Sequence, residues 1–471
     1  MTIELTTPVR RADALRVLTD GTVHLPGDPG YDAARLPWNV AVDQRPAAVA
    51  HPTDVAQVQE VVRAAAQAGL RVAPQSTGHN AGPLATQGLD DVVVLRTSAM
   101  TGVSIDPVRR LARVEGGALW IHATEPAAEH GLAALHGSSP DVGIAGYSLG
   151  GGIGWYARKL GLATNSLTGV ELVTADGEHV RADANRNPDL FWALRGGGGS
   201  FGVVTALEFR LYPIESAYAG MMIWDAALAE PVLRRWAQWA PGAPDEVTTS
   251  LRLLNLPPLP DIPEPLRGRS VVVLDGAVLA GDLQAERVLA GLRALRPEMD
   301  TFARVPARTL TRLHMDPEGP SPFVSDSTML DSLPEEAVEA FLGAAGPGSG
   351  TSLLLAELRQ LGGALGREHE GSGALKELDA QFIVFGGAIA ATPEMATRGE
   401  HDARQLVAAL EPWSNGRNYL NFAEGAVDPR TGYDELTWLR LKGIRSAVDP
   451  HGLFVGNHRI PRLVENGRVT D

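Results

Sequence analysis

Residues 137–154 read GSSPDVGIAGYSLGGGIG, an unusual segment because seven of its residues are glycine. Glycine carries no side chain, so a backbone rich in it can approach a bound molecule closely at many points. The segment leads into a helix-like run at residues 155–160. We therefore expect a loop over residues 137–154 that wraps around a ligand and is followed by a helix.

A second candidate ligand loop lies upstream, at residues 75–82, which read QSTGHNAG. Asp54 is a typical N-cap, and apolar residues recur after it at helical spacing until Gly69 ends the pattern. A short strand is expected over residues 70–74, so the polar loop directly follows a strand. Backbone N–H groups of such a loop can bind phosphate, and the His79 imidazole can face the ligand. From spacing alone, a ligand-facing and a purely structural His79 are equally good interpretations.

The pattern of the chain changes twice. Helix and strand periodicities alternate through the first 215 residues, whereas strand-like runs separated by helical stretches fill residues 216–411. We expect the middle part to be a separate domain built on an antiparallel sheet. The last 60 residues are predicted to contain an amphipathic helix whose apolar side chains include Leu436, Leu439 and Ile444.

A second glycine run matches a known pattern in the wrong context. Gly197-x-Gly199-x-x-Gly202 fits the dinucleotide-binding fingerprint, which requires a strand before it and a helix after it. Here a helix is predicted before the motif, at residues 189–194, and a strand after it, at residues 203–212. A Rossmann domain is therefore disfavoured, and a tight turn that touches a ligand is the better interpretation.

Residues 146–150, GYSLG, match the G-x-S-x-G nucleophile elbow, and Asp449 and His451 follow in the chain order of an α/β-hydrolase triad. An elbow requires a buried apolar strand before the serine, but proline, aspartate and glycine precede Ser148. A serine hydrolase that uses Ser148 is kept as the second functional hypothesis.

Composition and charge exclude several classes of function. The 471 residues include 41 basic and 56 acidic side chains, so the formal net charge is -15 at pH 7. Such a chain repels phosphate backbones and anionic membranes, and we expect neither nucleic acid nor a membrane as a partner. Cysteine is absent and the histidines lack ligand spacing, so no metal site is expected. No apolar run has the length of a membrane span or signal peptide, which predicts a cytoplasmic protein.

Tyr419 and Asn421 form a candidate pair near the C-terminal end. Two residues apart on a strand, their side chains would point to the same side and could share one pocket. A phenol can donate or accept a proton, and an amide can orient a substrate. Buried aromatic packing explains the same residues equally well.

Taken together, these segments resemble the FAD-linked oxidases of the vanillyl-alcohol oxidase fold, with its PCMH-type FAD-binding domain. The resemblance is strongest to the berberine-bridge-enzyme-like group, which includes 6-hydroxy-nicotine oxidase and the oligosaccharide oxidases. It covers nearly the whole chain, and the matching segments occur in the family's order: residues 45–82, 137–167, 173–213, 419–422 (YLNF) and 449–454 (DPHGLF).

The resemblance implies an α+β protein with two domains. Residues 1–215 and 412–471, from the two chain ends, would form the FAD-binding domain. Residues 216–411 would form a substrate-binding domain whose antiparallel sheet covers the flavin. The oligomeric state is left open.

The resemblance also implies FAD as the cofactor, bonded through His79 only. The motif histidine of the family is attached to the flavin 8α-methyl carbon, and members with a second bond have a cysteine where this chain has Ser139. Tyr419 and Asn421 match the family's C-terminal Y-x-N motif and would be the catalytic residues. The expected cofactor contacts are Gln75, Ser76, Thr77, Gly78, His79, Asn80, Ser138, Val142, Gly143, Gly146, Gly150, Gly151, Gly152, Val204, Tyr419 and Asn421.

The activity implied is that of an oxidase. A C–H bond of a small alcohol, sugar or amine would transfer hydride to flavin N5, and O2 would reoxidise the flavin and give hydrogen peroxide. Val142 falls where oxygen-reactive members leave access to the flavin. Tyr419 would assist proton removal, Asn421 would orient the reactants, and Glu357 is a competing base. A flavin-binding protein without catalytic activity is a third class.

Overall fold

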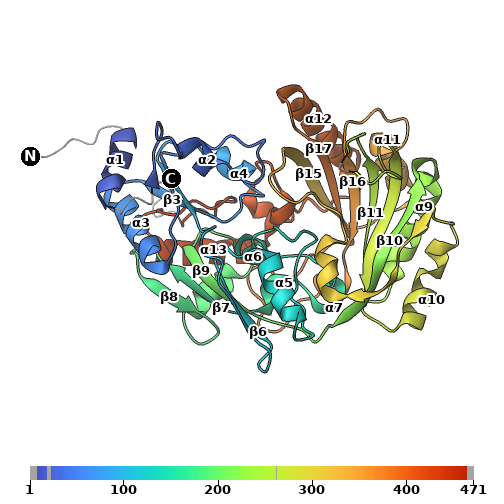
Figure 1. The fold of residues 1–471 in the computed structure, drawn as a ribbon, viewed down its shortest axis with the longest axis horizontal. Coiled ribbons are helices and arrows are strands. Elements are labelled where there is room, and N and C mark those ends of the chain that lie inside the picture. Colours follow the sequence, from blue (N-terminus) through green and yellow to red (C-terminus); the bar gives the residue numbers. More distant parts are fainter. Residues whose placement is uncertain (1–7, 19–22, 261, 464–471) are drawn as a thin grey trace, which may run out of the picture.

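The structure, a computed structural model, describes residues 8–18, 23–260 and 262–463. Three β-sheets and the helices packed on them make two lobes that lie side by side (Figure 1). Helices near both chain ends, α1 (Pro8–Leu18) and α13 (Glu435–Val448), lie in the same lobe. The architecture is therefore α+β, as predicted. None of the described helices combines the length and the apolar composition needed to span a bilayer.

The first lobe contains a four-stranded sheet in the order β1-β2-β4-β3. β2, β4 and β3 are parallel, and a helix connects β2 to β3, as a parallel crossover requires. That helix, α3, begins where predicted, because the Asp54 side chain accepts a hydrogen bond from the Gln57 N–H, and the chain turns away at Gly69 with φ +66°. The elements are β1 (Val23–His24), α2 (Tyr31–Arg35), β2 (Ala48–Ala50), α3 (Val55–Gln67), β3 (Arg71–Gln75), α4 (Gly82–Ala85) and β4 (Val92–Arg96).

A five-stranded antiparallel sheet in the order β5-β6-β9-β7-β8 completes this lobe. The β7–β8 hairpin turns at Asp176-Gly177, and Pro188 is the first residue of α8, both as predicted. The elements are β5 (Val103–Asp106), β6 (Leu111–Glu115), α5 (Trp120–Ala128), α6 (Ile144–Leu149), α7 (Ala157–Leu160), β7 (Leu167–Val173), β8 (His179–Ala182), α8 (Pro188–Leu194) and β9 (Val203–Arg210).

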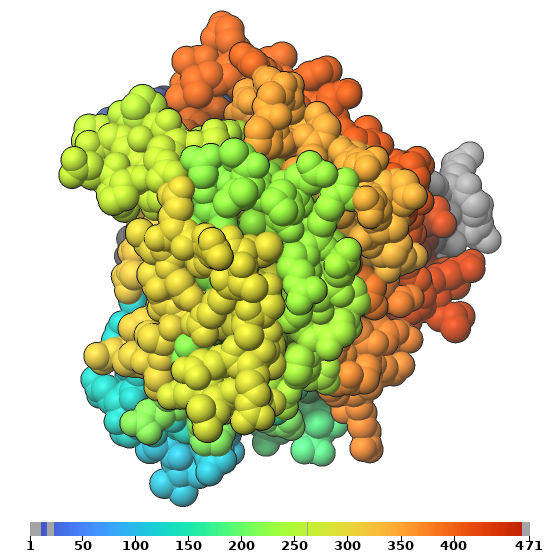
Figure 2. Space-filling model, turned by 90° about the vertical axis from the view of Figure 1, so that its right-hand side faces the viewer, coloured from blue at the N-terminus to red at the C-terminus, as the bar shows by residue number. Residues whose placement is uncertain are grey.

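The second lobe is built on an eight-stranded antiparallel sheet, which confirms the sheet predicted for the middle of the chain. Four helices pack on one face through a core that includes Trp236 and Phe341, and Figure 2 looks onto this outer side. The opposite face is turned toward the first lobe. The elements are β10 (Ser216–Asp225), α9 (Ala229–Trp239), β11 (Val247–Asn255), β12 (Ser270–Val278), α10 (Asp282–Arg293), β13 (Met299–Asp300), β14 (Ala303–Pro306), β15 (Phe323–Leu330), α11 (Glu335–Ala345), β16 (Leu355–Gln360), β17 (Phe382–Ile389) and α12 (Pro393–Ala409).

The glycine-rich segment differs from the prediction of a continuous loop. Its middle forms α6, with Gly143 as N-cap and Gly150 as C-cap, and the following helix begins at Ala157 rather than at residue 155. Glycines stand at both ends of α6, where they favour helix termini, and the buried Ile144 and Leu149 stabilise the helix between them. The loop was predicted from the high glycine content of the segment, and the short apolar run that forms the helix was overlooked.

The predicted apolar face of α13 is wrong at two of its three positions, because only Ile444 packs against the core. Leu436 is 80% exposed and Leu439 is 47% exposed, whereas Trp438, Leu441 and Arg445 are buried. Arg445 belongs to the buried face because its guanidinium pairs with the carboxylate of Asp449 inside the fold. A pattern of apolar residues alone could not reveal a buried arginine.

Candidate functional site

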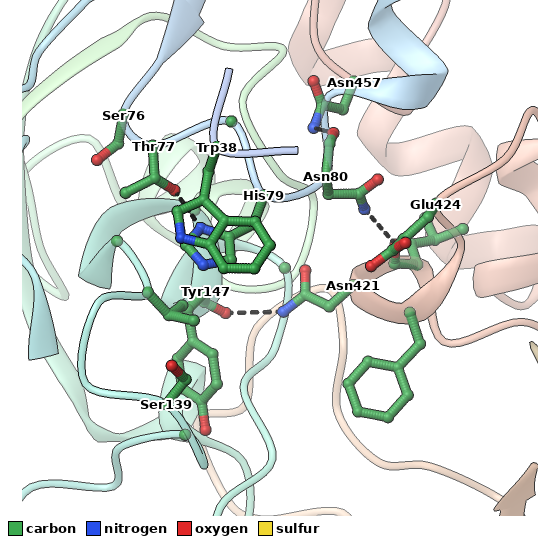
Figure 3. Close-up of a pocket in the computed structure, with 18 of the residues that line it drawn as sticks. Trp38, Ser76, Thr77, His79, Asn80, Ser139, Tyr147, Asn421, Glu424 and Asn457 are labelled. Atoms are coloured by element: carbon green, nitrogen blue, oxygen red, sulfur yellow. Dashed lines mark hydrogen bonds between the residues drawn. The ribbon is translucent and has the colours of Figure 1, made fainter. Parts of the chain in front are cut away.

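A cavity of about 570 Å³ lies where the two lobes meet. Its walls come from the loop after β3, the segment around α6, the start of β9 and the uncovered face of the eight-stranded sheet (Figure 3). Cofactor and small-molecule sites commonly measure about 300–1,000 Å³. Of the predicted site residues, all but Gly151 and Gly152 line the cavity: Gln75, Ser76, Thr77, Gly78, His79, Asn80, Ser138, Val142, Gly143, Gly146, Gly150, Val204, Tyr419 and Asn421.

His79 is held in one orientation by its neighbours. Its ring lies flat against the indole of Trp38, with 4.0 Å between the ring centroids and 16° between the planes (Figure 3). Nδ1 is 2.7 Å from the Thr77 hydroxyl, and Nε2 is 3.6 Å from a carboxylate oxygen of Asp141. Trp38 and Asp141 were not among the residues predicted from the sequence. Nothing in the local sequence of Trp38 indicates that it reaches this loop.

The ends of α6 fit tightly against two other parts of the site. A Cβ atom on Gly143 would lie 2.7 Å from Ser76 Oγ, and one on Gly150 would lie 1.9 Å from Asn421 Oδ1. In contrast, a Cβ atom on Gly146, which lines the cavity, would meet no protein atom within 4 Å. The backbone of α6 is therefore clamped at both ends and open toward the cavity between them.

Tyr419 and Asn421 come together, although they do not lie on a strand as predicted. Tyr419 directly precedes a short 3-10 turn at Leu420–Phe422 and Asn421 lies within it, because the Phe422 N–H bonds the Tyr419 carbonyl oxygen. The Tyr419 hydroxyl accepts hydrogen bonds from the Gly152 N–H at 2.7 Å and from Asn421 Nδ2 at 3.2 Å. Asn421 Nδ2 also donates to the carbonyl oxygen of Tyr147 at 3.0 Å (Figure 3). The turn thus joins both side chains to the segment around α6.

The phenol of Tyr419 is neutral at ordinary pH. Its side chain is buried, and this burial raises the pKa of Tyr419 well above the ordinary value despite the hydrogen bonds from Gly152 and Asn421. A neutral phenol whose oxygen already accepts two hydrogen bonds keeps its own hydrogen for donation.

A buried charged cluster forms the opposite wall on β16 and its neighbours. Oε1 of Glu357 accepts hydrogen bonds from Ser250 Oγ at 2.6 Å and from Arg359 Nε at 2.8 Å. His314 lies between two carboxylates, with Nδ1 2.8 Å from Asp275 Oδ2 and Nε2 3.8 Å from Glu357 Oε1. Glu357 was considered from the sequence, but its partners were not. Charged residues at alternate positions of an apolar strand were the available indication.

Two glutamates that line the cavity have pKa values shifted in opposite directions by their surroundings. Burial alone would raise the pKa of Glu357, but the charges of Arg359 and His314 and its hydrogen bonds lower it to about 2. Glu424 accepts a hydrogen bond from Ser325 Oγ at 2.8 Å, yet burial raises its pKa to about 7. Glu357 is therefore ionised at neutral pH, while Glu424 carries a proton for part of the population.

The residues required by the serine hydrolase hypothesis are not arranged for catalysis. Ser148 is 1% exposed and lies within α6 rather than at a strand-to-helix turn. The Asp449 carboxylate is occupied by Arg445 and by the N–H groups of Leu453 and Phe454. It therefore does not orient a histidine toward Ser148, and the structure gives this hypothesis no support.

The cavity has the features that a dinucleotide cofactor such as FAD requires. Ser76 Oγ, His79 Nε2 and Asn80 Oδ1 are buried and have no hydrogen-bond partner among the described residues. A Cβ atom on Gly198 or Gly199 would meet nothing within 4 Å, so this backbone is also open. Unpaired buried polar atoms are unfavourable, and a ligand rich in hydrogen-bonding groups would satisfy them.

Comparisons with known proteins agree with this description. Residues 46–183 match the FAD binding domain family. The chain is 37% identical over 211 residues to (R)-6-hydroxynicotine oxidase of Paenarthrobacter nicotinovorans, covering 45% of this chain and 46% of that protein. It is 34% identical over 228 residues to xylooligosaccharide oxidase of Thermothelomyces thermophilus, covering 46% and 45%. The chain thus spans about half the length of the curated relatives that it matches.

Solved structures match over almost the full length. The 6-hydroxy-D-nicotine oxidase of Arthrobacter nicotinovorans superposes with a TM-score of 0.81 at 27% identity, covering 94% of this chain and 98% of that chain. The BBE-like 1 protein of Physcomitrella patens superposes with a TM-score of 0.83 at 22% identity, covering 96% and 100%. The chain thus shares its fold with these two solved structures, and the relatives named above are homologues of this chain.

Proposed function

We propose that this chain, whose residues 46–183 form an FAD binding domain, is an FAD-dependent oxidase of small molecules. The observation that most directly supports this proposal is that three parts of the chain line one cavity: the His79 loop, the open backbone of α6 and the hydrogen-bonded pair Tyr419 and Asn421. The substrate is proposed to be an alcohol, a sugar or an amine, and O2 to be the electron acceptor that yields hydrogen peroxide.

FAD is proposed to lie along the backbone of α6 and to be bonded to the protein through His79. When bound, it supplies the hydride acceptor for the reaction. The loop after β3 and the open glycines would hold its phosphates and rings, with Val204 near the adenine end. A second covalent bond has no nucleophile, because Ser139 stands where a cysteine would be needed.

Tyr419 and Asn421 are proposed to position the substrate at the reacting face. The neutral Tyr419 hydroxyl can donate a hydrogen bond to a substrate oxygen or nitrogen, and Asn421 fixes its direction. Glu357 is a weak base because its pKa is near 2, and Arg359 and Ser250 already bond it. Its contribution is therefore proposed to be substrate binding through the charged wall rather than proton removal.

Oxygen access is proposed to pass the side chain of Val142. This residue lines the cavity between the loop at Ser139 and the start of α6. A small aliphatic side chain at this position leaves room for a diatomic molecule, which favours an oxidase over a dehydrogenase.

An absorbance spectrum of the purified protein, repeated after acid precipitation and washing, tests the proposal. We expect the unmodified protein to show a flavin spectrum, and its yellow colour to stay in the pellet. In a His79→Ala variant, acid should release the colour into the supernatant. Peroxide formation with panels of sugars, alcohols and amines then tests the activity. A protein that stays colourless after FAD is added would contradict the proposed function.

A further inference from the structure

Asp141 is the centre of a hydrogen-bond cluster beside His79. Its Oδ2 accepts hydrogen bonds from the Trp38 indole at 2.7 Å and from the Gly319 N–H at 2.8 Å. Its Oδ1 accepts one from Ser139 Oγ at 2.8 Å and lies 3.6 Å from His79 Nε2. Donors from two distant parts of the chain and from the neighbouring Ser139 therefore fix this carboxylate at one edge of the imidazole.

The carboxylate keeps its negative charge in this position. Burial alone would raise the pKa of Asp141, but the close His79 ring and the hydrogen bonds from Gly319, Trp38 and Ser139 outweigh burial and hold the pKa well below the usual range. The side chain is only 17% exposed, so water screens this charge weakly.

A fixed negative charge at Nε2 determines which imidazole nitrogen carries the proton. At 3.6 Å the contact is electrostatic and longer than a hydrogen bond, yet it favours a proton on Nε2. Nδ1 then keeps its lone pair, and the Thr77 hydroxyl 2.7 Å away can donate to it. A carboxylate behind one nitrogen also fixes the orientation of the ring and the direction of the other nitrogen, as in carboxylate–histidine pairs at metal sites.

We propose that Asp141 promotes the attachment of the flavin to His79, acting as a positioning residue through the imidazole. This inference rests on the proposed covalent FAD. Attachment forms a bond between His79 Nδ1 and the methyl carbon of the cofactor and breaks one C–H bond of that methyl group. The imidazole gains positive charge as the bond forms, and the ionised Asp141 stabilises this charge. The methyl proton, the Nε2 proton and the two electrons released pass to O2, which becomes hydrogen peroxide.

The test compares acid-stable flavin in Asp141→Asn, Asp316→Asn and the unmodified protein, each purified with FAD. Asp316 also lines the cavity and accepts a hydrogen bond from Ser138 Oγ at 3.0 Å, so Asp316→Asn removes a nearby loop carboxylate that is not paired with His79. We expect Asp141→Asn to bind FAD, but its acid-precipitated pellet should show at least about tenfold less flavin fluorescence than that of the unmodified protein. We expect Asp316→Asn to retain it. Equal acid-stable flavin in all three proteins would overturn the inference.

One further variant separates charge from loop structure. Ser139→Ala removes one donor to Asp141 and keeps its carboxylate. We expect it to attach flavin to nearly the extent of the unmodified protein. If it loses attachment as fully as Asp141→Asn, the cluster acts through loop structure and the inference is wrong. If the unmodified protein binds FAD but acid releases all of it, the inference fails while the proposed oxidase stands.

Discussion

The hydroxyl of Tyr419 accepts a 2.7 Å hydrogen bond from the backbone N–H of Gly152, which precedes it by 267 residues. This contact ties the C-terminal segment to the glycine-rich segment at the cavity wall. This hydrogen bond and the one from Asn421 Nδ2 occupy the acceptor positions of the phenol oxygen. The hydroxyl hydrogen therefore points to a third partner. Tyr419 is thereby preorganised as a donor toward the cavity.

Tyr419→Phe removes that donor without changing the size of the ring. We expect flavin reduction by substrate to slow by roughly a hundredfold or more, because a side chain positioned to donate a proton or hydrogen bond in the transition state typically raises the rate by that factor. Anaerobic stopped-flow measurement of flavin bleaching checks this. Tyr156→Phe is the matched control, since Tyr156 is equally buried but does not line the cavity. An unchanged rate in Tyr419→Phe would remove this residue from the mechanism.

Alanine substitutions at Gly150 and Gly146 are expected to differ in their effect on the stability of the folded protein. The new methyl group at Gly150 would collide with Asn421, so Gly150→Ala should lower stability by about 1–3 kcal/mol and displace Asn421. Gly146→Ala should keep the stability of the FAD-free protein, because the methyl group points into open space within a helix. It should instead weaken FAD binding.

Thermal unfolding of the FAD-free proteins and FAD titrations measure the two effects separately. If Gly146→Ala bound FAD as tightly as the unmodified protein does, the placement of FAD along α6 would be contradicted.

Ser148→Ala is expected to leave peroxide production within twofold of the unmodified protein. Ser148 is buried inside α6 and does not line the cavity. The same variant should show no loss of ester hydrolysis relative to the unmodified protein, whatever background that assay has. A selective loss of hydrolysis would restore the serine hydrolase hypothesis.

Glu424 should make the protein less stable as the pH rises toward 8. Its pKa of about 7 in the folded state exceeds the ordinary glutamate value of 4.5, so the folded state binds more protons between these values. The associated stability is fully present below about pH 4.5 and is lost as the pH rises through 7.

Glu424→Gln lacks this titration. Relative to the unmodified protein, we expect it to gain up to about 3 kcal/mol in unfolding free energy between pH 5 and pH 8. Chemical denaturation at these two pH values provides the comparison. A constant difference across the range would show that Glu424 titrates like an exposed glutamate.

Local features of the fold could be predicted because short-range chemistry determines them. Asp54 caps α3, Pro188 begins α8 and the turn at Asp176-Gly177 joins β7 to β8, each through contacts within a few residues. The α+β class came from the resemblance to a known family, and the change of pattern near residue 215 agreed with it. The division into domains at residues 215 and 411 stays a prediction.

Features that depend on tertiary contacts could not be predicted from local patterns. The Trp38–Asp141 hydrogen bond joins two residues that are 103 positions apart in the chain, and no sequence pattern near Trp38 predicts it. The buried face of α13 includes Arg445 only because Asp449 is folded against it. Family motifs led to the residues along the cavity, whereas the charged wall at Glu357 required knowledge of which strands are neighbours.

The side chain of Asn457 donates to the carbonyl oxygen of Asn80, which lies 377 residues earlier. Asn80 is synthesised first and lacks this partner until 377 further residues have followed it. Sequential folding from the N-terminus can complete individual strands and helices, but it cannot close this wall of the cavity before Asn457 has been made. The finished cavity therefore exists only after synthesis has passed Asn457, and a ligand that needs this wall can bind fully only from that point on.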